Sequence, residues 1–144
     1  MRITETFTVD APPEKVFDYI THASNLAAWQ TTKTYVEQLT DGPPGLGTRV
    51  KERTKPPGVK EFDQIVEFTE FDRPRRLHVH VVEGPYPVDG TWTFTPDGER
   101  TVVGFTAEGE LRGAMRFVQP IFQLVLARQF RGYHRNLRRN VASA

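Results

Sequence analysis

The sequence predicts an α+β protein in which a curved antiparallel sheet of about six or seven strands wraps around one long C-terminal helix. Between residues 33 and 110, apolar and polar side chains alternate in short runs separated by glycine and proline, as in strands joined by tight turns. From residue 119 onward, apolar side chains recur at steps of three and four, as in a helix. Such an arrangement can leave a cavity between sheet and helix.

The N-terminal part is expected to form one strand and two short helices. Residues 3–9 alternate, with the apolar side chains and Glu5 on one side. Three signals indicate the start of the first helix. Asp10 or a neighbour can cap it, a proline suits its first turn, and Glu14 favours the positive end of the helix dipole. The second helix is expected at residues 23–29.

Six further strands are predicted, and short turns between them imply antiparallel pairing. Their expected ranges are 33–39, 48–54, 61–71, 77–82, 88–95 and 101–110. Charged residues stand on both sides of the strand at 48–54, so we expect it to lie near an edge of the sheet or to be partly exposed. We expect Glu52 and Arg53 to form ion pairs on the surface.

The C-terminal helix is expected to run from Gln119 to Val141, about 30 Å in length, with Pro120 in its first turn. One face carries an apolar stripe, formed by Phe122, Leu126, Phe130, Tyr133, Leu137 and Val141. Four more apolar side chains of the first half fall outside the stripe: Phe117, Ile121, Leu124 and Val125. The other side of the second half is basic, with Arg128, Arg131, Arg135, Arg138 and Arg139.

Composition narrows the function classes. The 144 residues suit a single domain, residues 1–144, and the net charge of +1 argues against a general nucleic-acid binder. The arginine cluster is interpreted as a solvated helix face, with binding of nucleic acid or of an acidic surface as the alternative. The chain has no cysteine, which excludes disulfides and thiolate chemistry. Because no signal peptide or membrane span is recognised, we expect a cytoplasmic protein.

Four motifs, in this order, resemble those of one superfamily. They are Val9–Phe17 (apolar-x-Ala-Pro-x-Glu-x-Val-Phe), Leu26–Trp29, Gly45–Val50 and Phe68–Leu77. Together with the terminal helix, they make nearly the whole chain similar to the START-like (SRPBCC) superfamily, in particular its polyketide cyclase/dehydrase-like branch. The resemblance implies the helix-grip fold. It does not imply one function, since a fold hosts many.

Alternation along the strands, combined with this resemblance, gives a set of expected ligand-binding residues. Gln64 and Gln129 are polar groups on apolar faces and suit the orientation of a ligand, although Gln64 can also face water at a strand end. Tyr133 can close a pocket end or belong to the core, and Tyr86 lies on a rigid turn suited to a pocket mouth. The predicted set is Phe62, Gln64, Val66, Tyr86, Trp92, Phe94, Phe105, Phe122, Leu126, Gln129 and Tyr133.

No catalytic set stands out in the sequence. His78 and His80 lie two apart on one strand, and we interpret them as exposed histidines of the outer face; a pocket or metal role is the alternative. Four carboxylates are candidates for acid–base chemistry by strand position alone: Asp63, Glu67, Asp89 and Glu108. No metal or cofactor is predicted.

Three functional hypotheses remain. The first is a carrier or sensor that binds a small, largely hydrophobic lipid, polyketide or aromatic molecule between sheet and helix. The second is a polyketide cyclase or dehydratase, which requires an ionisable group inside the cavity. The third is a protein-interaction or lipid-surface module, in which the apolar first half of the helix faces a partner or a second copy. The chain is expected to be a monomer or a homodimer.

Overall fold

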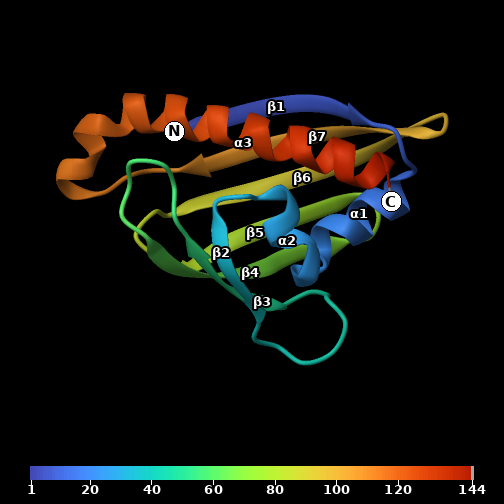
Figure 1. Cartoon of the computed structure of the whole chain (residues 1–144), viewed down its shortest axis with the longest axis horizontal. Coiled ribbons are helices and arrows are strands. Elements are labelled where there is room, and N and C mark those ends of the chain that lie inside the picture. Colours follow the sequence, from blue (N-terminus) through green and yellow to red (C-terminus); the bar gives the residue numbers. More distant parts are fainter. Residues whose placement is uncertain (144) are drawn as a thin grey trace.

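The computed structural model describes residues 1–143 and has the predicted helix-grip architecture (Figure 1). A seven-stranded antiparallel sheet has the order β1-β7-β6-β5-β4-β3-β2. Its strands are β1 (Arg2–Val9), β2 (Lys33–Gln38), β3 (Arg49–Thr54), β4 (Phe62–Asp72), β5 (Arg76–Glu83), β6 (Val88–Asp97) and β7 (Arg100–Gly109). Each predicted strand is present, with ends that differ by one or two residues.

Two short helices follow β1, as predicted: α1 (Pro13–Thr21) and α2 (Ala23–Trp29). The N-cap of α1 is Pro12, and no side chain bonds to the free N–H groups there. The expectation that Asp10 or a neighbour caps this helix with its side chain is therefore wrong. Proline at the first position and Glu14 in the first turn supply the remaining start signals, as expected.

The long helix α3 (Gln119–Ala142) lies across the sheet. It follows η1 (Gly113–Val118), a 3-10 helix that the sequence did not predict. The apolar stripe of α3 faces the sheet, and its C-terminal half is buried at Tyr133, Leu137 and Val141. No helix within residues 1–143 is both long enough and apolar enough to cross a membrane.

The two halves of α3 cover different regions of the sheet. The C-terminal half closes a solid core together with α1 and α2, where Phe17, Trp29 and Leu137 are almost fully buried. The N-terminal half borders a cavity together with residues of β2 to β7 and does not fill it. The fold therefore places an apolar core at one end of the sheet and a cavity at the other.

Candidate functional site

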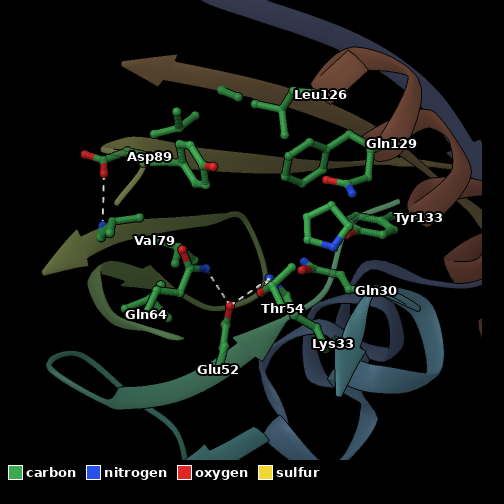
Figure 2. A pocket seen from close by; sticks show the side chains of 18 of the residues that line it. Gln30, Lys33, Glu52, Thr54, Gln64, Val79, Asp89, Leu126, Gln129 and Tyr133 are labelled. Atoms are coloured by element: carbon green, nitrogen blue, oxygen red, sulfur yellow. Dashed lines mark hydrogen bonds and ion pairs between the residues drawn. The ribbon is translucent and has the colours of Figure 1, made fainter. Parts of the chain in front are cut away.

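A cavity of about 250 Å³ lies between the sheet and the N-terminal half of α3 (Figure 2). Most of its wall is apolar. The side chains that form this part of the wall belong to the strands, the loops around them and α3: Pro56, Val59, Phe62, Val66, Val79, Val81, Tyr86, Val88, Trp92, Ala107, Met115, Phe122, Val125, Leu126 and Phe130.

Three aromatic rings stand together where the cavity meets the surface. Tyr86, on the turn between β5 and β6, stacks on Phe122 of α3 with ring centroids 5.3 Å apart. The edge of Tyr86 also meets Phe62 of β4 at 4.9 Å. The structure thus brings three sequence-predicted residues, from three separate segments, into one contact at the rim of the cavity.

A polar cluster is centred on Glu52 of β3. Gln64 donates a hydrogen bond from Nε2 to Oε1 of Glu52 at 2.8 Å, and Nζ of Lys33 lies 3.1 Å from the same oxygen. Lys33 also donates to the hydroxyl of Thr54 at 3.0 Å. Figure 2 shows these side chains on the sheet side of the cavity, opposite Leu126 and Gln129. Both of these contacts of Glu52 involve the same oxygen, Oε1.

The prediction that Glu52 pairs on the surface is wrong. Glu52 is buried, whereas its neighbour Arg53 is on the outer face and donates to Asp63 at 2.8 Å, as expected for a surface pair. Alternation explains the difference, because Val50, Glu52 and Thr54 share the inner face of β3. Glu52 is the functional candidate that the sequence reasoning missed, and the two-residue period from Val50 was the available signal.

Tyr133 forms the polar end of the α3 wall. Its hydroxyl is hydrogen-bonded to the hydroxyl of Thr32, and burial, reinforced by the nearby Glu52 carboxylate, raises the pKa of Tyr133 to about 12. Tyr133 therefore stays a neutral phenol at physiological pH. The side-chain amides of Gln30 and Gln129 also line the cavity and make no hydrogen bond to other residues within 1–143.

Nine of the eleven predicted ligand-binding residues line the cavity: Phe62, Gln64, Val66, Tyr86, Trp92, Phe122, Leu126, Gln129 and Tyr133. The other two, Phe94 and Phe105, lie in the core outside the lining. Phe94 packs edge-on against Phe17 of α1 at 5.4 Å, because it lies further along β6 beneath that helix. Phe105 lies behind Trp92, with ring centroids 4.9 Å apart.

A buried histidine, which the sequence analysis did not single out, is hydrogen-bonded to a tryptophan of the cavity wall. His134 of α3 is 1% exposed, and its Nδ1 lies 2.7 Å from Oε1 of Glu5. Trp92 donates its indole N–H to Nε2 of His134 at 3.1 Å. Nε2 is therefore the acceptor, so the proton resides on Nδ1 and is donated to Glu5. This chain of hydrogen bonds fixes the ring of Trp92 in the wall.

The other carboxylates considered from the sequence are engaged elsewhere. Asp63 and Glu67 form ion pairs with arginines of β3, and Glu108 pairs with Arg2. Asp89 borders the cavity, but its carboxylate accepts the backbone N–H of Val81 at 3.0 Å and contacts His80. None of the four presents a free carboxylate to the cavity.

The two histidines of β5 share the outer face, as interpreted, but only His80 is exposed. His78 is half-buried and hydrogen-bonded to Thr91, with Nδ1 and Oγ1 2.7 Å apart. His80 is exposed, and its Nδ1 lies 2.8 Å from Asp89. No group of three or more His, Asp or Glu side chains within residues 1–143 is arranged to hold a metal ion.

The sequence matches the family described as polyketide cyclase/dehydrase and lipid transport over residues 1–143. The chain belongs to this family. The match spans every element of the fold, including the cavity and α3, so the family explains the architecture as a whole. Comparison with curated proteins found no match.

Solved structures of similar proteins have the same fold. A protein of Thermus thermophilus has a TM-score of 0.85 at 22% identity, over 99% of this chain and 98% of that one. The Zhui aromatase/cyclase of a Streptomyces species has a TM-score of 0.80 at 18% identity, over 99% and 93%. A START superfamily protein of Mycobacterium smegmatis has a TM-score of 0.79 at 12% identity, over 99% and 97%. At these identities the likeness concerns the fold.

Proposed function

We propose that this protein, acting as a single domain, binds a small, largely hydrophobic molecule in the cavity between the sheet and α3, as a carrier or sensor. The observation that carries the proposal is the cavity of about 250 Å³ with apolar walls and one polar end. A cavity of this kind excludes water from an apolar body and orients it by a few polar contacts. Membership of a family that includes lipid-transport proteins supports this function.

The polar end narrows the chemistry of the ligand. Glu52 offers an oxygen that accepts a hydrogen bond, and Gln30 and Gln129 each offer an unpaired amide. A ligand that displaces water from these groups has to replace the lost hydrogen bonds, so polar atoms at matching positions favour its binding. We therefore propose an apolar molecule that carries hydroxyl or carbonyl oxygens at one end, with a hydroxyl placed to donate to Glu52.

Mass spectrometry of freshly purified protein, under native and then denaturing conditions, tests this function. A discrete mass that is lost on denaturation is the expected result, and its formula gives the ligand class. Titration with 1-naphthol and with naphthalene provides the second test: we expect the hydroxylated probe to bind more tightly, and Gln30→Leu to reduce that preference. Protein without a bound mass that also binds neither probe contradicts the proposal.

A second candidate function is a cyclase acting on a polyketide-like or aromatic substrate. The observation that favours it is a buried carboxylate that faces the cavity and has hydrogen-bonding partners, namely Glu52 with Gln64 and Lys33. Its carboxylate would remove the proton from a carbon beside a carbonyl, while the neutral Tyr133 hydroxyl donates a hydrogen bond to the enolate oxygen. The enolate carbon would then attack a second carbonyl, and Glu52 would return the proton to the new alkoxide.

Product analysis separates the two functions. A carrier returns the identified ligand unchanged, whereas a cyclase converts a linear polyketone to a ring. If the protein is a cyclase, Glu52→Gln should abolish this activity and retain binding of the polyketone. Unchanged turnover in Glu52→Gln contradicts the enzymatic role assigned to this residue. Arg53→Gln is the matched control, because Arg53 is the next residue on β3 and lies on the outer face.

A further inference from the structure

The outward face of η1 and the first half of α3 is unusually apolar. Phe117 is 77% exposed, Ile121 67% and Leu124 73%, and Val125 follows at 57%. Their spacing of four, three and one places them on a single helical face. We call this surface the α3 docking face and define it as Phe117, Ile121, Leu124, Val125 and the arginines beside them, Arg112, Arg116, Arg128 and Arg131.

The charge around the docking face has one sign. Residues 111–144 contain seven arginines and no aspartate or glutamate, whereas all 18 acidic residues of the chain lie within residues 1–110. Arg128 and Arg131 continue the exposed face of α3 directly after Val125, and Arg112 and Arg116 precede Phe117. Although the net charge is only +1, the positive and negative charges are therefore unevenly distributed along the chain, and the four exposed apolar side chains belong to the basic region.

The docking face adjoins the cavity. Val125 of the docking face also lines the cavity, and so does Met115 of η1, which is 44% exposed. Figure 1 shows η1 and the start of α3 projecting beyond the strands at this end of the molecule. An apolar molecule that leaves the cavity between these residues emerges on an apolar surface and not directly in water.

We propose that the α3 docking face binds an anionic lipid surface, with its apolar side chains inserted and its arginines at the headgroups. Exposed apolar side chains flanked by arginines, in a stretch of sequence that has no acidic residue from 111 to 144, match the chemistry of an interfacial helix on anionic lipid. A second copy of this chain suits the face less well, because a symmetric contact would bring the arginines of the two copies together.

Flotation with lipid vesicles tests this proposal on the full chain, without any cavity ligand, so its outcome is independent of ligand binding. We expect binding to vesicles of phosphatidylcholine mixed with phosphatidylglycerol, at least about tenfold tighter than to phosphatidylcholine alone and weakened by salt. Ile121→Ser with Leu124→Ser should reduce binding about tenfold or more, and so should Arg128→Gln with Arg131→Gln.

Matched controls use equally exposed residues outside the face. Leu46→Ser changes a leucine that is 74% exposed on the loop between β2 and β3, and Arg75→Gln changes an exposed arginine after β4. Both should bind vesicles like the unchanged protein. The proposal is overturned if the protein does not bind anionic vesicles, if the controls weaken binding as much as the face variants, or if sedimentation shows a dimer that Ile121→Ser with Leu124→Ser dissociates.

Discussion

The Nζ atom of Lys33 lies 3.1 Å from Oε1 of Glu52, and each of these side chains is only 7% exposed. The two residues come from neighbouring strands, β2 and β3, and both line the cavity. Removing two opposite charges from water is unfavourable, and mutual attraction together with hydrogen bonds offsets that cost. Gln64 and Thr54 supply the hydrogen bonds here. The pair thus keeps a carboxylate inside an otherwise apolar cavity.

A double-mutant cycle tests how far the two charges depend on each other. Lys33→Met and Glu52→Gln should each lower the free energy of unfolding by about 3 kcal/mol, because each leaves an unpaired buried charge. The double variant should be more stable than the sum of the single effects predicts, since it contains neither charge. Urea unfolding measures all four proteins. Additive losses would show that the two charges are independent. Arg53→Met with Asp63→Asn, on the outer face of the same sheet, is the control and should change stability little.

The sequence was sufficient for the fold and for most of the cavity wall. The seven strands and the buried stripe of α3 follow from periodicities of two and 3.6, which depend on local side-chain direction alone. The same rule places Glu52 on the inner face with Val50, whereas its charge alone favours the surface. His134 likewise follows Phe130 by one helical turn and lies on the buried face.

Other features depend on contacts between distant segments. The hydrogen bond between Thr32 and Tyr133 joins residues 101 positions apart, and no local pattern specifies it. Phe94 and Phe105 are on the inner face of the sheet, as the alternation predicts. They lie in the core and not in the cavity wall because α1 and the second half of α3 cover their part of the sheet. Periodicity therefore identifies the inner face, and only tertiary packing separates core from cavity.

Filling the cavity should abolish ligand binding without unfolding the protein. Leu126 faces the cavity from α3, so Leu126→Trp should remove the co-purified mass seen under native conditions while the circular dichroism spectrum is preserved. Leu124 is two residues away and 73% exposed on the opposite side of α3, so Leu124→Trp is the matched control and should retain the mass. Retention of the mass by both variants would place the ligand elsewhere.

The chain from Trp92 through His134 to Glu5 should contribute strongly to stability. His134→Phe keeps the ring stack on Phe7 but leaves the indole N–H of Trp92 and the carboxylate of Glu5 without a partner, at a cost of about 3 kcal/mol. Denaturant unfolding measures this loss, and His80→Phe, on the exposed outer face, should cost much less. Nitrogen-15 NMR should show the proton of His134 on Nδ1. A proton on Nε2 would mean that Trp92 does not donate to this ring.

Tyr133 should make the protein lose stability in alkali. Its pKa is raised to about 12 in the fold from an ordinary value of 10.0, chiefly by burial. Below pH 10 the phenol is neutral in both states, so its contribution is fully present. Between pH 10 and 12 only the unfolded chain releases the proton, and the free energy of unfolding falls by about 2 to 3 kcal/mol through this group.

Comparison with Tyr133→Phe isolates this loss. Unfolding free energies of the unchanged protein should fall more steeply than those of Tyr133→Phe between pH 10 and 12, and the two curves should run parallel below pH 10. Thr32→Val removes the hydrogen bond to the phenol but keeps the phenol itself, so it should retain the steep fall. Parallel curves for the unchanged protein and Tyr133→Phe across the whole range would show that Tyr133 ionises equally easily in the folded and unfolded states.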